Sequence, residues 1–200
     1  MNLLDTVVNA QDGDVLRQLA NNLHLDENQT RSAVGALVPA LSRGLGNNAS
    51  SPEGLDDLIG ALSRGNHSRY IEQPAALDET AAVDEGNGIL GHIFGSKDVS
   101  RQVAARAAES SGVDSSILKK MLPMLASVAM GAMAKQGFGS GSAGQAAGDQ
   151  GGGFGGLLAG FLDADKDGSV DPEHGFDMKW EIASESKKHV KAIADAELAT

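Results

Sequence analysis

One segment limits the folds open to this chain more than any other. Residues 117–133, ILKKMLPMLASVAMGAM, are apolar on nearly every side of a helix. A helix without a polar face has to be covered all round, so the segment predicts the central and most buried helix of the protein. Its four methionines suit either an adaptable binding groove or the gaps of a core, and the core is the favoured interpretation.

The composition favours an all-α fold class. Hydrophobic residues make up 41% of the 200 residues, whereas aromatic residues make up only 4%. The core must therefore consist mainly of Leu, Val, Ile, Ala and Met, and small side chains favour closely packed helices over a sandwich or barrel. We expect a compact multi-helix bundle in a domain of residues 1–135.

Two related helical units are predicted within that domain, at about residues 1–65 and 88–135. The heptapeptide DVLRQLA recurs 84 residues later as DVSRQVA (positions 14 and 98), and the same offset relates Pro39 to Pro123. Each unit would contain a capped amphipathic helix followed by a longer helix with an internal proline.

Local signals mark where helices begin and where they are interrupted. Asp26 with Gln29 predicts a capping box, and Ser51 followed by Pro52 predicts another helix start. Between the two units, residues 72–88 are acidic and lack periodicity, which predicts a linker or a long loop.

The last third of the chain has a different composition. Residues 136–162 are predicted to be a flexible spacer, because 11 of the 24 residues in 137–160 are glycine. Its end, GGLLAGFL, is an apolar plug that would dock on the core or on a neighbouring molecule. Residues 163–200 predict an Asp-rich loop and an amphipathic helix that begins at Pro172 and carries Trp180.

The charge and the termini exclude several classes of partner and location. A formal net charge of −11 argues against nucleic acid and against anionic membrane surfaces, since both need clustered Lys and Arg. The chain has no cysteine, no basic and apolar leader at its start, and no run of about 18 continuous apolar residues. We therefore expect a cytoplasmic protein without a membrane span.

The stretch FLDADKDGSVDPEH, residues 161–174, is the one place that suggests metal chemistry. Counted from Asp163, it matches the Ca²⁺ loop of EF-hands as far as position 9, but the bidentate glutamate of position 12 is replaced by His174. The candidate ligands are Asp163, Asp165, Asp167, Ser169, Asp171 and Glu173. The alternative is a solvated turn in which Asp171 caps the last helix. No cofactor other than Ca²⁺ is indicated.

Catalytic motifs are not indicated. GNGILG, residues 86–91, matches the glycine pattern of dinucleotide-binding loops, but no hydrophobic strand precedes it. The five histidines are scattered, and each is interpreted as structural or solvated. The acidic pair Asp84 and Glu85 is interpreted as part of a solvent-exposed surface, not as a catalytic acid or base.

Four stretches together resemble the YidB-like family of bacterial proteins of unknown function. They are NNASSPEGLDDLIGAL, GNGILGHIFGSKD, ILKKMLPMLASVAMGAM and FLDADKDGSVD. The resemblance covers roughly residues 1–171 and implies a wholly helical fold and a bacterial source. It brings no activity and no catalytic residue. Family members often end soon after the aspartate-rich turn, so residues 172–200 depart from the pattern.

These features favour a non-catalytic helical protein that self-associates or binds another protein. The lack of a recognised active site, the plug behind a glycine spacer and the amphipathic tail support this hypothesis. Two alternatives stay open. One is a protein that responds to Ca²⁺ through the Asp-rich loop, and the other is an enzyme with an unrecognised pocket between the helical units.

Overall fold

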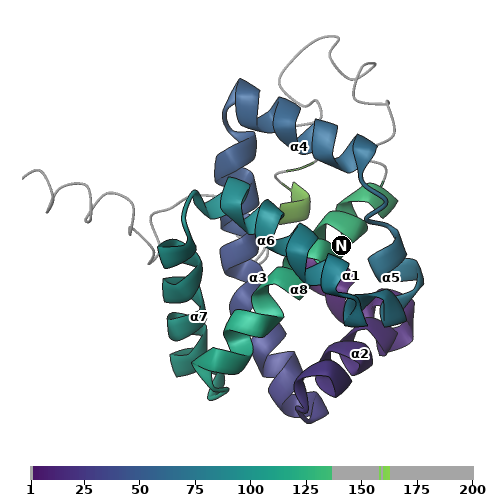
Figure 1. Ribbon diagram of the computed structural model, residues 1–200, viewed down its shortest axis with the longest axis vertical. Helices are drawn as coiled ribbons and strands as arrows, with labels where there is room; N and C mark the ends of the chain where they lie inside the picture. The colour runs from purple at the N-terminus through teal and green to yellow at the C-terminus, as the bar shows by residue number, and fades with distance from the viewer. Residues whose placement is uncertain (1, 137–157, 159, 163–200) are drawn as a thin grey trace, which may run out of the picture. The chain divides into compact units, whose positions relative to one another are not determined.

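The computed structural model describes residues 2–136, 158 and 160–162, and within these residues it is helical and contains no strand (Figure 1). This confirms the all-α fold class. The elements are α1 (Leu3–Asn9), η1 (Ala10–Gly13), α2 (Asp14–Leu23), α3 (Glu27–Ala49), α4 (Pro52–Arg64), α5 (Arg69–Glu72), η2 (Pro74–Asp78), α6 (Thr80–Phe94), α7 (Lys97–Ser111) and α8 (Ser115–Lys135).

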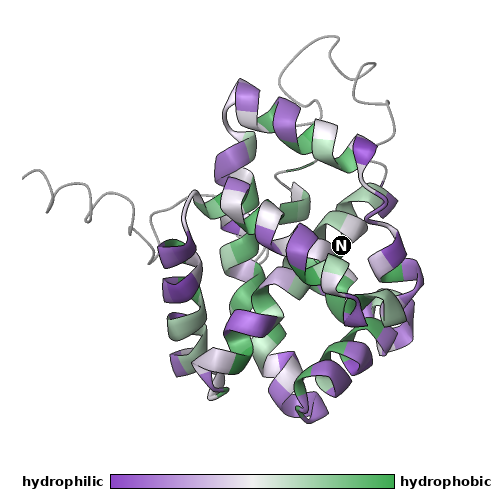
Figure 2. Ribbon diagram, in the orientation of Figure 1, coloured by the Kyte–Doolittle hydropathy of each residue, from purple (hydrophilic) through white to green (hydrophobic). Residues whose placement is uncertain are grey.

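The helix α8 is the centre of the bundle. Every residue from Met121 to Met133 is buried, and α8 packs against α6, α7, α1 and α5. Figure 2 shows hydrophobic residues along α8 and along the inner sides of the helices around it, with hydrophilic residues on the outer sides. The prediction of a central, most buried helix is therefore confirmed, and its methionines lie in the core.

Length and composition alone would also allow α8 to cross a membrane. Within the described part of the chain it is the one helix that passes this test, and 78% of its most apolar window is buried inside the protein. The core helix of a globular domain has the same length and composition, so this finding is weak evidence for a membrane span.

The helix starts follow the local signals in the sequence. The Asp26 carboxylate accepts a hydrogen bond from the Gln29 backbone N–H at 2.8 Å, and the Gln29 side chain accepts one from the Asp26 N–H at 3.2 Å. Ser51 caps α4, whose first residue is Pro52. The reciprocal pair satisfies two N–H groups that a helix start otherwise leaves unbonded.

The prediction of a linker or long loop at residues 72–88 is wrong. The turn η2 lies in this segment, and α6 begins at Thr80 and continues to Phe94. The buried face of α6 consists of Ala82, Gly86 and Leu90, which recur every fourth residue. Two of these three residues are small, so the segment shows little hydrophobic periodicity although it forms a helix that packs closely on α8.

The apolar plug is partly described, and it belongs to the core. Leu158, Phe161 and Leu162 are 2%, 6% and 1% exposed and belong to the same hydrophobic cluster as the side chains of α1 to α8. The predicted spacer segment 137–157 lies outside the described residues. Pro39 and Pro123 lie inside α3 and α8 as expected, whereas the relationship of the two helical units stays a prediction.

Candidate functional site

The six candidate Ca²⁺ ligands, Asp163 to Glu173, lie outside the described residues, so the metal site stays a prediction from sequence. Within residues 2–136, 158 and 160–162, no group of three or more His, Asp or Glu side chains is placed to hold a metal ion. Titration calorimetry of the full chain with Ca²⁺, compared with Asp163→Ala, tests the loop directly. Heat in the wild type that the variant lacks would support a site, and no heat would exclude it.

A cluster of four polar side chains is the most concentrated chemistry in the described part of the chain. His67, Arg69 and Tyr70 lie on the short segment that connects α4 to η2, and Glu85 lies on α6. We call these four residues the Glu85 cluster. Tyr70 is fully buried and fixes the segment in the core. The backbone of the segment also lies close to α8, because a Cβ at Gly131 would crowd the His67 carbonyl.

The carboxylate of Glu85 is the acceptor at the centre of this cluster. Arg69 donates from Nη2 to Glu85 Oε1 at 2.8 Å, and the Tyr70 hydroxyl donates to Oε2 at 2.9 Å. Arg69 Nη2 also lies 2.6 Å from the Tyr70 hydroxyl oxygen. These bonds link the α5 segment to α6, and the charged acceptor makes them stronger than hydrogen bonds between neutral groups.

The two nitrogens of His67 have different neighbours. Its Nδ1 lies 3.4 Å from Glu85 Oε2 and makes no well-aligned hydrogen bond. The Ala61 carbonyl of α4 acts on the other side of the ring and raises its pKa slightly. Gly65 makes room for this arrangement, since a Cβ at Gly65 would overlap Nε2.

Burial governs the titration of this cluster. Desolvation lowers the pKa of His67 below its ordinary value of 6.5, and Glu85 opposes this only in part. Desolvation also raises the pKa of Tyr70 above its ordinary value of 10.0. The phenol therefore stays protonated and donates a hydrogen bond to Glu85. The hydrogen bond to Tyr70 raises the pKa of Arg69, which stays charged.

This arrangement suits a structural link between helices better than acid or base catalysis. A catalytic imidazole needs one nitrogen directed at the substrate, and here the His67 side chain is only 10% exposed and its Nδ1 faces Glu85. The cluster can bind or release a proton at His67, and it can hold the α4–α5 connection against α6.

Sequence reasoning missed this cluster. Glu85 was interpreted as part of a solvated acidic face, and its side chain is 38% exposed and bonded to Arg69 and Tyr70. Its neighbour Asp84 is exposed, as expected. No spacing rule pairs a residue at position 85 with residues at 67–70, because the pairing depends on how α5 and α6 both pack against α8.

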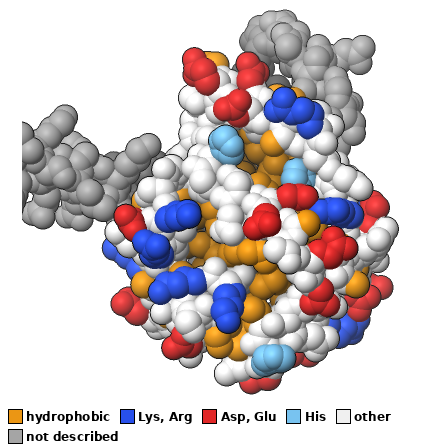
Figure 3. All heavy atoms as spheres, in the orientation of Figure 1, with side chains coloured by type: hydrophobic (Ala, Val, Ile, Leu, Met, Phe, Trp, Pro, Cys, Tyr) orange, Lys and Arg blue, Asp and Glu red, His pale blue; other side chains and the backbone are white. Residues whose placement is uncertain are grey.

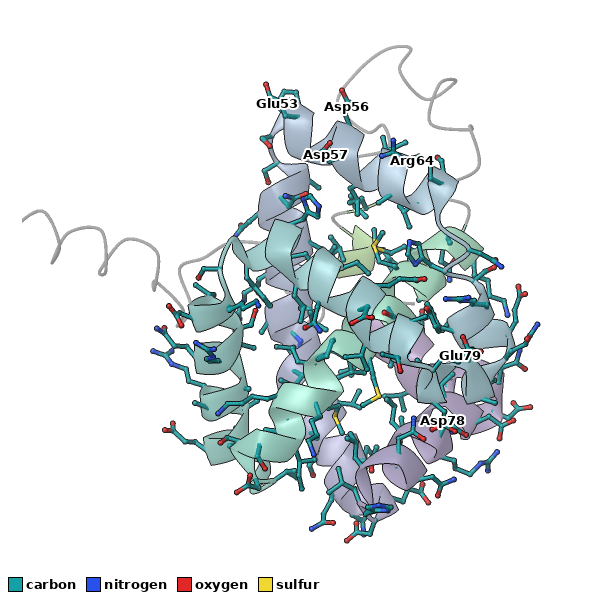
Figure 4. All side chains as sticks on the ribbon, viewed as in Figure 1. Glu53, Asp56, Asp57, Arg64, Asp78 and Glu79 are labelled. Atoms are coloured by element: carbon teal, nitrogen blue, oxygen red, sulfur yellow. The ribbon has the colours of Figure 1, made fainter. Side chains whose placement is uncertain are left out.

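The outer surface carries mixed charges. Figure 3 shows acidic and basic side chains around hollows in which hydrophobic atoms reach the surface. Along α4, the carboxylates of Glu53, Asp56 and Asp57 point away from the bundle, and Arg64 lies towards the other end of the helix (Figure 4). These exposed charges leave the opposite face of α4, with buried Leu58 and Leu62, for contacts with the core.

A second candidate site is the place that the plug occupies. Leu158, Phe161 and Leu162 follow the i, i+3, i+4 spacing of a helical segment laid into an apolar groove. They share one hydrophobic cluster with Leu58 and Leu62 of α4. In the view of Figure 1 this short piece is seen in the space between α4 and α6.

Comparison with known proteins gives one finding. A family model described as "Bacterial protein of unknown function (DUF937)" matches residues 5–136. The match begins in α1 and ends just after α8, so it spans the helical domain. Searches of the curated proteins and of the solved structures gave no match.

Proposed function

We propose that this chain, which belongs to the YidB-like bacterial family of unknown function, is a non-catalytic interaction protein whose helical domain binds a short apolar helical segment. One observation carries the proposal. Leu158, Phe161 and Leu162 are buried in the core of the domain, although residues 137–157 separate them in sequence from the end of the matched region. The domain therefore has a place for an apolar segment that is not one of its own continuous helices.

The energetics of this docking favour exchange. Burying one Leu or Phe side chain contributes roughly 2 kcal/mol, whereas ordering the backbone of each residue costs about 1–2 kcal/mol. For a segment of five residues these two contributions are similar in size, so the net free energy of docking is small. A segment held by such a small free energy opens and closes readily.

The same docking in a second molecule would produce self-assembly. Exchange of an identical element between two copies keeps every contact and therefore costs little. The flexible spacer predicted from the sequence, about 20 residues up to the plug, would give the chain's own plug an effective concentration on the order of 1 mM, so the closed monomer would dominate at micromolar concentrations. Assembly then requires a high local concentration or a partner segment that binds more tightly than the plug.

The test uses the full-length chain with a labelled peptide that corresponds to residues 155–164. The variant Leu158→Ser, Phe161→Ser, Leu162→Ser frees the site, and we expect it to bind the peptide measurably more tightly than the wild type does. Gly160→Ser is the matched control, because Gly160 is exposed and a Cβ there would meet open space. This control should behave as the wild type.

Two outcomes would contradict the proposal. One is that the triple variant binds the peptide no better than the wild type and the Gly160→Ser control do. The other is a Gly160→Ser control that binds the peptide as tightly as the triple variant does, because the gain would then not depend on emptying the site. A cytoplasmic location, the lack of a nucleic-acid partner and the lack of catalysis remain predictions that rest on the charge and the motifs of the sequence.

A further inference from the structure

The backbone between α1 and α2 is left-handed at three residues in succession. Gln11 has φ 49° and ψ 48°, Asp12 has φ 53° and ψ 34°, and Gly13 has φ 85°. Glycine adopts this region freely, but a side chain such as that of Gln11 is crowded there, and residues other than glycine normally enter it singly. The turn is therefore strained, and the structure around it has to hold it in place.

The docking of α1 holds this turn. Leu3 and Val7 of α1 are 0% and 1% exposed, and α1 packs against α3 and α8. We call the surface of α3 and α8 that α1 covers the α1 site. A helix of seven residues is not stable by itself in water, so α1 depends on these contacts. The chain has to turn at residues 10–13 to bring α1 onto this site.

The sequence of the turn also allows a second conformation. Ala10 and Gln11 are good helix formers, and Gly13 does not prevent a helix as proline would. If residues 10–13 became right-handed, α1 would continue into α2 as one helix and the strain would disappear. The apolar side chains of α1 would then leave their own α1 site and need another apolar surface. The α1 site of a second copy is such a surface.

We propose that this chain forms a dimer by exchange of α1, in which residues 10–13 open and each copy inserts Leu3 and Val7 into the α1 site of the other. The exchanged dimer keeps the contacts of the closed monomer, so the balance depends on the turn. Opening removes the strain at Gln11 and Asp12, whereas association costs translational freedom. Short hinges under strain favour exchange for this reason. The exchange does not depend on the docking of the plug proposed above.

The test refolds the full-length chain from denaturant at micromolar to millimolar concentrations and measures the dimer by light scattering. Gln11→Gly, Asp12→Gly removes the strain from the closed monomer, so we expect its dimer dissociation constant to lie roughly tenfold or more above that of the wild type. Gln11→Ala, Asp12→Ala is the matched control. It removes the same polar side chains, but alanine is still crowded in the left-handed region, so this variant should dimerise at least as strongly as the wild type.

Two further measurements identify the exchanged element. The triple serine variant of the plug should still dimerise, which separates exchange of α1 from exchange of the plug. In a wild-type dimer refolded from isotopically labelled and unlabelled copies, isotope-filtered NMR should show contacts from the Leu3 and Val7 methyl groups of one copy to methyl groups of α3 or α8 of the other.

Four outcomes would overturn the proposal. The first is a wild type that stays monomeric up to millimolar concentration. The second is a glycine variant that dimerises as strongly as the wild type and the alanine variant do. The third is the loss of the dimer in the plug variant, and the fourth is a dimer in which the methyl groups of Leu3 and Val7 contact only their own chain.

Discussion

Gly86 of α6 lies directly against the carbonyl of Pro123 in α8, so closely that a Cβ at Gly86 would overlap that carbonyl. One turn away along both helices, the Ser127 hydroxyl donates to the Ala82 carbonyl at 2.7 Å. Small residues on α6 thus let two helix backbones approach, and a buried hydrogen bond joins them. This contact places α6, and with it Glu85, over the central helix.

The first prediction concerns Gly86→Ala. Alanine favours a helix by about 1 kcal/mol relative to glycine, but the new methyl group would push against a backbone carbonyl, and overpacking of this kind costs about 1–3 kcal/mol. Because the carbonyl belongs to the central helix and cannot turn away, we expect the overpacking to prevail and the free energy of unfolding to fall by up to about 2 kcal/mol. Denaturant unfolding of the wild type and of Gly86→Ala measures this difference in the free energy of unfolding.

Gly88→Ala is the matched control on the same helix. Gly88 is exposed, and a Cβ there would meet no atom within 4 Å. This substitution should stabilise the protein by up to about 1 kcal/mol. Equal stability of the two alanine variants would show that α6 and α8 do not approach as described.

The second prediction concerns the hydrogen bond between Ser127 and Ala82. Ser127→Ala removes the donor of a fully buried hydrogen bond, and we expect a loss of about 1 kcal/mol in the free energy of unfolding. Ser42→Ala is the comparison, because the Ser42 hydroxyl is buried without a hydrogen-bond partner. That change should be neutral or stabilising, since it removes a polar group that lost its water on folding.

The third prediction is a pH dependence of stability. The pKa of His67 lies below its ordinary value of 6.5 in the folded protein, so the unfolded chain binds a proton more readily than the folded chain does. The contribution of His67 to stability is therefore complete above about pH 6.5 and is lost as the pH falls through the folded pKa. Thermal or denaturant unfolding between about pH 5 and pH 7.5 should show this loss.

Two variants isolate the contribution of His67 to this dependence. His67→Gln should flatten the change in the free energy of unfolding over this range, because the variant has no titrating ring. His92→Gln changes an exposed side chain on α6 and should keep the slope of the wild type. If both variants keep the wild-type slope, another group is responsible for it.

The fourth prediction concerns the start of α3. Asp26→Ala removes the acceptor for the Gln29 backbone N–H and should lower the free energy of unfolding by about 1 kcal/mol. Asp26→Asn keeps an oxygen in the same place and should cost much less. An alanine variant as stable as the asparagine variant would mean that the capping box contributes little to the stability of α3.

Much of the fold follows from local features of the sequence. The capping box at Asp26, the Ser51 and Pro52 start of α4 and the apolar surface of residues 117–133 all predicted elements that the structure contains. Each of these signals depends on residues within about one or two helical turns, so it can be recognised without knowledge of the fold.

The relationship between distant segments was decided only by the tertiary structure. Helix α6 was missed because its buried face uses Ala82 and Gly86, and small side chains give no hydrophobic signal although they allow the closest approach of two backbones. The Glu85 cluster was missed for a related reason. Glu85 meets His67 and Arg69 only because α6 and α5 both pack against α8, and the charge of a side chain does not reveal which distant donors will surround it.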